Sequence, residues 1–305
     1  MVPITPYIAA MSPQTPYGGL LGALAPAIRT VVTEWPTNPP GGIVLASTPY
    51  QLDSRLASLP TDRILVFPGG STRASYRQYA EQAGPPGRAA FALSRTIHPG
   101  LNCQEWRPLS LRQFDLSPER FRQANNLTAN RLIGVQTDAP DILLDCFRIA
   151  AELPDSVLII QTKLPDLDQL SEGYRVPYRR ITITPEVMRV LDWVLAVDGF
   201  SPDGIEALRA LACGVPVVGI DHHETARFAE QGIAAEAAWF EPYRDGSDTI
   251  AKWRVNPSKV ANQIREAEQA GLHRDKVLAG IRFARQFDQS VAIKTLTELA
   301  NQTTV

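Results

Sequence analysis

Short strand-like runs alternate with helical patterns through the middle of this 305-residue chain. Apolar runs bounded by turn residues are typical of buried strands. Such runs occur at RLIGV (131–135), SVLII (156–160), RRITIT (179–184), WVLAV (193–197) and PVVGI (216–220). Between them, apolar residues recur at helical spacing within 138–150, 185–191 and 204–213. Alternation at this interval predicts an α/β fold with a doubly wound parallel sheet. We expect Asp138 to cap the first of these helices.

The two ends of the chain carry weaker patterns. In the proline-rich first 130 residues, strands are expected at 43–46, 64–67 and 89–93, and a helix over 20–32. After residue 250 the pattern is helical to the end, at 257–269, 276–287 and 289–301. We therefore expect two Rossmann-like domains, at 1–125 and 126–285, and a last helix within 286–305 that packs back toward the first domain.

Charge and cysteine usage narrow the classes of function. Thirty basic and 32 acidic side chains give a net charge of −2, which excludes a strongly cationic polyanion binder. No apolar run approaches the roughly 20 residues that span a bilayer, and no secretory signal is visible. Cys103, Cys146 and Cys213 lack the spacing of a zinc site, and we expect the last two to be buried. These features predict a soluble cytoplasmic protein.

The segment 196–221 combines the features of a ligand site. A buried strand ends at Val197, a polar turn and a helix follow, and Gly214-Val215-Pro216 stops that helix. Ligands of open α/β sheets bind at the carboxyl ends of strands, where helix N-termini favour phosphate. Asp198 and Glu206 lie eight positions apart and can share one rim of a crevice, where carboxylates accept hydrogen bonds from sugar hydroxyls.

A purely structural role for Glu206 is the alternative. Asp203 and Glu206 fit the spacing of a capping box before an apolar helix. Glu206 would then satisfy a backbone donor of its own helix. The surrounding residues favour ligand binding over this alternative.

Those surroundings resemble a known signature. Asp198-Gly199-Phe200, then Glu206-Ala207, then Cys213-Gly214-Val215-Pro216 resemble the Glu-x7-Glu motif of retaining glycosyltransferases with the GT-B fold. That fold has two facing doubly wound Rossmann-like domains. The resemblance implies that Asp198 binds hydroxyls of the donor sugar as the catalytic candidate, and that Glu206 binds the ribose diol. It also implies a donor-binding role for the intervening turn, at Gly199, Phe200, Ser201 and Asp203.

The diphosphate part of the resemblance is incomplete. Gly18-Gly19 resembles the family's N-terminal glycine loop, which faces the donor diphosphate. The family's phosphate-binding Arg and Lys have no counterpart in the loop 134–139, which holds an acid instead. We expect Lys163 or Arg180 to supply the cation, with Arg179 as a further candidate. The family's active-site histidine also has no counterpart, because the context of His98 does not match.

Other polar loops are candidates for the acceptor side or for ordinary turns. Four residues in loops that follow predicted strands are the candidates: Thr48, Ser71, Arg73 and His222. The run Asp221-His222-His223-Glu224 suggests a metal site, but adjacent histidines rarely share one ion, and no further ligand cluster is present. We expect neither a metal nor a resident cofactor, with the nucleoside-diphosphate sugar serving as co-substrate.

The resemblance predicts a glycosyltransferase that moves a sugar from a nucleoside-diphosphate sugar, with UDP favoured, to an acceptor hydroxyl with retention. Three alternatives stay open. One is a hydrolysing or epimerising enzyme on the same fold. Another is a non-catalytic nucleotide-sugar-binding scaffold, which the missing cations would suit. The third is a transferase acting on hydroxymethylated DNA bases, to which the near-neutral charge gives little support. The acceptor itself, whether glycan, small molecule, protein or modified DNA, cannot be read from the sequence.

Overall fold

The computed structural model divides the chain into two compact units. Unit 1 comprises Met1–Ser110, Arg244–Thr249 and Phe287–Val305, and unit 2 comprises Leu111–Tyr243 and Ile250–Gln286. The residues that the structure describes are 7–11, 30–32, 42–46, 64–66, 91–92, 104–105, 118–127, 129, 131–197, 205–221, 223–245, 248–271, 273–288, 290, 291, 294 and 298. Each unit is described separately below.

Unit 1 contains a parallel four-stranded sheet in the order β2-β1-β3-β4. Its strands are β1 (Tyr7–Met11), β2 (Thr30–Val32), β3 (Gly42–Ala46) and β4 (Ile64–Val66). The strands predicted at 43–46 and 64–67 are confirmed as β3 and β4. The helix predicted over 20–32 is wrong at its end, because Thr30–Val32 forms β2. These three β-branched residues are stiff side chains that suit a strand better than a helix.

The remaining strand prediction in unit 1 is confirmed only at its centre. The run 89–93 contributes β5 (Phe91–Ala92), which pairs in parallel with β6 (Gln104–Glu105) rather than with the four-stranded sheet. An apolar run identifies a buried strand but not its neighbour, so pairing at this distance along the chain could not be predicted.

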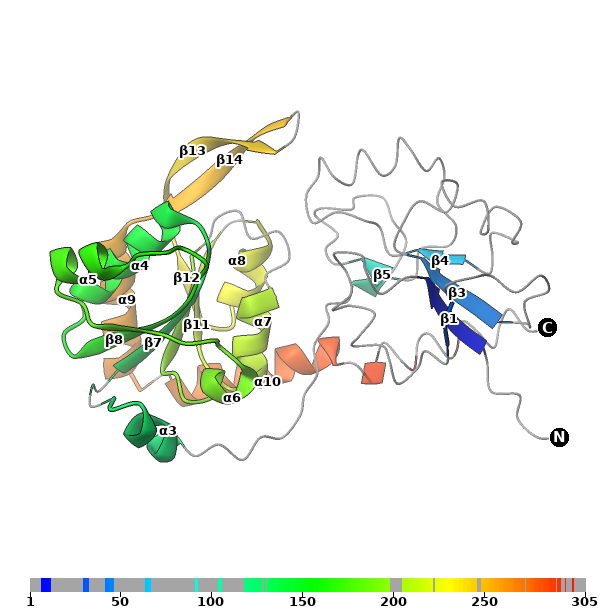
Figure 1. Ribbon diagram of the computed structural model, residues 1–305, viewed down its shortest axis with the longest axis horizontal. Coiled ribbons are helices and arrows are strands. Elements are labelled where there is room, and N and C mark those ends of the chain that lie inside the picture. The colour runs from blue at the N-terminus through cyan, green and yellow to red at the C-terminus, as the bar shows by residue number, and fades with distance from the viewer. Residues whose placement is uncertain are drawn as a thin grey trace. The chain divides into compact units, whose positions relative to one another are not determined.

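Unit 2 is built on a six-stranded, all-parallel sheet in the order β12-β11-β10-β7-β8-β9 (Figure 1). Its strands are β7 (Arg131–Gln136), β8 (Ser156–Gln161), β9 (Tyr178–Arg180), β10 (Trp193–Ala196), β11 (Val217–Ile220) and β12 (Ile233–Ala235). The chain builds outward from β7 to β9, then returns to β10 and builds outward in the other direction. This is the doubly wound order predicted from the sequence, and it places a topological switch point between β7 and β10.

The helices of unit 2 precede, connect and follow its strands. They are α3 (Pro118–Ala124), α4 (Pro140–Ala151), α5 (Asp168–Tyr174), α6 (Pro185–Met188), α7 (Ile205–Ala212), α8 (His223–Ala229), α9 (Pro257–Gln269), α10 (His273–Ala284) and the 3-10 turn η3 (Arg285–Phe287). α4 is the central one: Leu143, Cys146 and Phe147 have no exposed surface and pack into a core shared with β7, β8 and α9. The helix predicted at 257–269 coincides with α9.

Two local predictions in unit 2 are wrong. Asp138 does not cap α4, whose N-cap is Ala139 without a side-chain bond. Its carboxylate instead accepts a 2.6 Å hydrogen bond from the backbone N–H of Lys163. The strand predicted at 179–184 ends early, at Arg180. Thr184 leaves the sheet because its hydroxyl accepts from the N–H of Val187 at 3.4 Å and caps α6.

A β-hairpin that belongs to unit 2, except for its tip at Arg244–Thr249, is absent from the sequence prediction. β13 (Ala237–Asp245) pairs with β14 (Asp248–Val255) and extends away from the sheet and helices of the unit (Figure 1). The expectation of helix after residue 250 is therefore wrong for residues 250–255. In β14, Lys252 and Arg254 alternate with Trp253 and Val255. This alternation is typical of a half-buried strand, but it is too short to stand out beside the helical pattern that follows. None of the helices in the described part of the chain combines the length and apolar composition needed to cross a bilayer.

Candidate functional site

The switch point lies where β7 and β10 pair, with Leu195 opposite Val135. Both strands end at the same edge of the sheet, β7 at Gln136 and β10 at Ala196. In open α/β sheets, this edge of the switch point is where the ligand crevice forms. The connection from β10 to α7, residues 198–204, leaves from this point, since Val197 directly follows β10. It contains Asp198, Gly199, Phe200, Ser201 and Asp203, which lie outside the described residues.

Glu206 stands in the first turn of α7 and is half-buried. The apolar face of this helix is fully packed, because Ala207, Leu208, Ala210 and Leu211 are each at most 1% exposed. Glu206 is therefore off that face, at the helix end nearest the carboxyl edge of the sheet. An acid in the first helical turn is favoured by the helix dipole in either role, as a ligand-binding group or as a cap.

The Cys213-Gly214-Val215-Pro216 motif has a structural explanation. Gly214 has φ +76° and ends α7. The N–H of Gly214 bonds the carbonyl of Leu211 at 3.1 Å, and the N–H of Val215 bonds that of Ala210 at 2.9 Å. This pair of bonds is a Schellman cap, which favours glycine at its left-handed position. The motif thus fixes the length of α7 and the start of β11, and it marks the fold rather than a ligand contact.

Lys163 lies just beyond β8, at the same edge of the sheet as the switch point. Its side chain is 92% exposed, and its Nζ lies 3.6 Å from a carboxylate oxygen of Asp138. Asp138 also accepts a 3.3 Å bond from the hydroxyl of Thr162. The backbone bond from Lys163, followed by its charge, lowers the pKa of Asp138 below its ordinary value. The ammonium group is free to reorient toward a ligand, since its ion pair is solvent-exposed and therefore weak.

Arg180 is placed differently, at the end of the outermost strand β9. Its guanidinium donates to the backbone carbonyl of Leu164 and, at 3.2 Å, to that of Pro165. It therefore holds the loop after β8, and β8 lies between its strand and β7. Of the two expected cations, the geometry favours Lys163.

The remaining sequence candidates lie outside the described residues. They are Gly18, Gly19, Thr48, Ser71, Arg73 and His222. Next to His222, the carboxylate of Asp221 accepts a 2.9 Å bond from the N–H of Ala237 at the start of β13. Asp221 thus joins the end of β11 to the hairpin.

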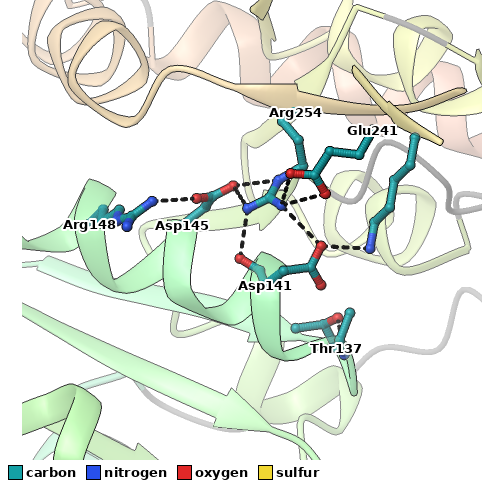
Figure 2. Close-up of polar contacts among 8 residues, drawn as sticks. Thr137, Asp141, Asp145, Arg148, Glu241 and Arg254 are labelled. Carbon is teal, nitrogen blue, oxygen red and sulfur yellow. Dashed lines mark hydrogen bonds and ion pairs between the residues drawn. The ribbon is translucent and has the colours of Figure 1, made fainter. Parts of the chain in front are cut away.

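An ion cluster that the sequence analysis missed joins that hairpin to α4 (Figure 2). The guanidinium of Arg254 donates to Asp145 Oδ2 at 2.6 and 2.9 Å and to Asp141 Oδ2 at 3.1 Å. Glu241 lies 3.3 Å from the same guanidinium, and Lys252 Nζ lies 2.8 Å from Asp141. Two aspartates four positions apart on one helix face, opposite a Lys-x-Arg strand pattern, were the available signal.

Burial governs the electrostatics of this cluster. Asp145 is 1% exposed and Arg254 5% exposed. Burial raises the pKa of Asp145, although Arg254 and Arg148 oppose the shift. Burial also acts to raise the pKa of Asp141. The pKa is nevertheless lowered, because the hydrogen bond and charge of Lys252 and the charge of Arg254 outweigh burial. Arg254 is fully engaged by carboxylates, so it cannot stand in for the phosphate-binding cation that the loop 134–139 lacks.

Among the comparisons with known proteins, the solved structures indicate one architecture. No family model matches the chain, and no curated protein matches it. Among solved structures, a glycosyltransferase from Rickettsia africae ESF-5 is 9% identical, with a TM-score of 0.66 over 98% of this chain and 99% of that one. WaaG, a glycosyltransferase involved in lipopolysaccharide biosynthesis, is 15% identical, with a TM-score of 0.58 over 97% and 99%.

A third structure, trehalose-6-phosphate from E. coli bound with UDP-2-fluoro glucose, is 12% identical, with a TM-score of 0.58 over 92% of this chain and 78% of that one. Identities this low carry the likeness of fold alone. These structural matches and the parallel sheets of the two units confirm the α/β class predicted from the sequence. The chain has the GT-B fold of these glycosyltransferases.

Proposed function

We propose that this protein is a glycosyltransferase that binds a nucleoside-diphosphate sugar at the carboxyl edge of the six-stranded sheet. The observation that carries the proposal is the switch point between β7 and β10. The segment with the Asp198-x7-Glu206 spacing starts there and ends in the first turn of α7. A phosphate-bearing ligand at this point would meet a helix N-terminus, where backbone amides favour negative charge.

Each proposed group has a distinct task. Asp198 holds hydroxyls of the donor sugar, and Glu206 accepts from the ribose diol of the nucleotide. Gly18, Gly19 and the backbone of residues 199–203 stabilise the negative charge that develops on the departing diphosphate. Lys163, whose ammonium is exposed at the same edge, supplies the compensating cation. An acceptor hydroxyl then attacks the positioned anomeric carbon from the face on which the diphosphate departs. The new C–O bond forms as the C–O bond to the diphosphate breaks, and the hydroxyl proton passes to the departing diphosphate oxygen.

Two finer features rest on similarity. UDP is the proposed nucleotide, because the similar E. coli structure is bound with UDP-2-fluoro glucose. Retention at the anomeric carbon follows from the resemblance of the Asp198–Glu206 spacing to the retaining signature. The donor is consumed as a co-substrate, and we propose no resident cofactor. The acceptor-side roles of Thr48, Ser71, Arg73 and His222 stay predictions.

The decisive experiment compares two acid variants with a matched control. We expect Asp198→Asn and Glu206→Ala to lower the rate of donor hydrolysis or transfer by about 100-fold or more, measured by mass spectrometry with UDP-sugars. Loss of a cap alone would cost only about 0.5–2 kcal/mol of stability, so both variants should stay folded. Glu186→Ala removes an acid from the first turn of α6 and should leave turnover unchanged. Unaltered kinetics in both acid variants would refute the proposed donor site.

Calorimetry separates the transferase from a non-catalytic scaffold. Binding of UDP or a UDP-sugar, together with slow donor hydrolysis, supports the transferase. Binding without any turnover on a panel of acceptors identifies a nucleotide-sugar-binding scaffold instead. If no nucleoside diphosphate binds, the proposal fails altogether.

A further inference from the structure

The hairpin β13–β14 exposes aromatic side chains. Among the side chains that the structure describes, the large apolar ones left exposed are Phe240 at 59%, Leu278 at 45% and Trp239 at 41%. Two of these three are consecutive on β13, so their side chains lie on opposite faces of the hairpin. Trp253 on β14 is half-buried and meets Phe240 edge to face, with ring centroids 5.3 Å apart and an interplanar angle of 60°. A hairpin that leaves this much aromatic surface in water is a candidate binding surface.

The aromatic hairpin is held rigidly. The guanidinium of Arg254 lies 5.9 Å from the ring centroid of Trp239, and the same group is bound to Asp145 and Asp141 of α4. Trp253 packs against the core of the unit. The rings are therefore presented in a fixed arrangement before any ligand arrives, which lowers the entropic cost of binding.

The hairpin is anchored next to the proposed donor site. Its Lys252 binds Asp141, which lies in the first turn of α4. That helix begins directly after β7, and Figure 2 shows Thr137, the residue that follows β7, beside Asp141. The anchor thus lies at the carboxyl edge of a switch-point strand. A ligand on the hairpin would approach the edge of the sheet where the donor sugar is proposed to bind.

The chemistry of the hairpin selects a neutral, hydroxyl-rich ligand. Aromatic rings offer flat apolar faces to the C–H faces of a sugar ring, and the half-exposed carboxylate of Glu241 can accept hydrogen bonds from hydroxyls. The segment 237–255 carries three acids, at 241, 245 and 248, and three bases, at 244, 252 and 254. An anionic membrane surface or a DNA acceptor would require an excess of basic residues. The balanced charge therefore favours an uncharged glycan.

We propose that the hairpin β13–β14 binds the acceptor, and that the acceptor is a neutral glycan chain whose rings stack on the face of the hairpin that carries Phe240 and Trp253. This inference rests on the proposed glycosyltransferase function. It adds the class of acceptor and the surface that holds it, both of which lie outside the donor-binding segment.

Affinity electrophoresis of the full chain tests the surface without any donor. Native gels would contain soluble dextran, hydroxyethylcellulose, glycol chitin or mannan, each at several concentrations. We expect at least one polysaccharide to retard the wild-type protein, and Trp239→Ala/Phe240→Ala to weaken that retention at least tenfold. Leu278→Ala is the matched control, since Leu278 is similarly exposed on α10. It should behave as wild type, and circular dichroism should show all three proteins folded.

Several results would overturn the inference. One is the absence of retention on all four polysaccharides. Another is equal retention of the wild type and the double variant. A third is binding to vesicles instead of glycans. If the wild type is not retarded by any polysaccharide but sediments with phosphatidylcholine–phosphatidylglycerol vesicles, and the double variant does not sediment, the hairpin binds membranes.

Failure of this inference can be told apart from failure of the proposed function. The inference alone is overturned if the wild type binds UDP and hydrolyses a UDP-sugar, but the double variant has an unchanged KM for the acceptor. Wild type that binds no nucleoside diphosphate overturns the proposed function, whatever the gels show. With both intact, the double variant should raise the KM for the retained glycan at least tenfold and leave donor hydrolysis unaltered.

Discussion

Arg254 on the hairpin and Asp145 on α4 form a buried ion pair, with Nη2 and Nε donating to one carboxylate oxygen at 2.6 and 2.9 Å. The two residues are 109 positions apart in the chain. Their bond ties an otherwise projecting hairpin to the helix that starts at the switch point. The other oxygen of Asp145 lies 3.5 Å from Arg148, so the carboxylate sits between two cations.

Breaking this pair from one side should be costly. Arg254→Met leaves Asp145 buried without its main partner, and we expect the free energy of unfolding to fall by about 3–5 kcal/mol. Replacing both partners, as in Asp145→Leu/Arg254→Met, removes the stranded charge and should cost much less. Urea denaturation followed by circular dichroism measures both values.

The exposed pair between Lys259 and Glu236 provides the control. Their side chains are 64% and 70% exposed, and the N–O distance is 3.0 Å. Solvent-exposed pairs contribute little, so Lys259→Met should change stability by less than about 1 kcal/mol. Equal losses for Arg254→Met and Lys259→Met would show that the hairpin is not anchored as described.

Acid should weaken the same anchor through Asp141. The pKa of Asp141 is lowered in the folded protein, because its bonds to Lys252 and Arg254 outweigh the effect of burial. An acid with a lowered folded pKa stabilises above its unfolded pKa of about 3.9 and loses this contribution as the pH falls through the folded value. The difference in unfolding free energy between wild type and Asp141→Asn should therefore shrink as the pH is lowered from about 7 to 3.5. Asp275→Asn, at an exposed site on α10, serves as the reference; a wild-type advantage that grows in acid would contradict the assignment.

The sheet of unit 2 could be predicted because its strands are short, apolar and bounded by turn residues. The runs at 131–135, 156–160 and 193–197 became β7, β8 and β10, and the parallel, doubly wound arrangement followed from strand–helix alternation. The same pattern placed the candidate site at the carboxyl end of the strand before Asp198, whereas the switch point between β7 and β10 became visible only in the structure. Cys146 was predicted to be buried and has no exposed surface, because it lies on the apolar face of α4.

The hairpin and its ion cluster could not be predicted, because their stability comes from partners far away in the chain. Arg254 becomes buried only when Asp141 and Asp145, more than 100 positions earlier, neutralise it. From the local sequence alone, a charged residue such as Arg254 is predicted to be exposed to solvent. The prediction for Cys213 is also wrong. It was predicted to be buried, but it is half-buried because it lies just after the end of α7.

Gly214 offers a test of the structural explanation for the Cys-Gly-x-Pro motif. With φ at +76°, alanine would be strained there, and Gly214→Ala should lower stability by about 1 kcal/mol. Gly271, at φ +64° after α9, should respond alike, although it lies far from the candidate site. Gly173 in α5 has no atom near its virtual Cβ and no positive φ, so Gly173→Ala should stabilise by about 0.5–1 kcal/mol. Thermal unfolding compares the three; a Gly214→Ala variant as stable as wild type would return the motif to a purely functional explanation.

The thiol of Cys213 should be unreactive, even though it lies at the end of the helix that carries Glu206. Burial raises the pKa of Cys213 to about 11, and its Sγ lies 3.7 Å from the carbonyl oxygen of Pro185, to which the S–H can donate. Only the thiolate is alkylated, so iodoacetamide at a pH of about 8 should leave Cys213 unmodified in the folded protein and label it after denaturation. Peptide mass spectrometry reads each cysteine separately. Cys213→Ser keeps a hydrogen-bond donor for the carbonyl of Pro185 and should retain full activity. Rapid labelling of Cys213 in the folded protein would instead mean that the end of α7 opens to solvent.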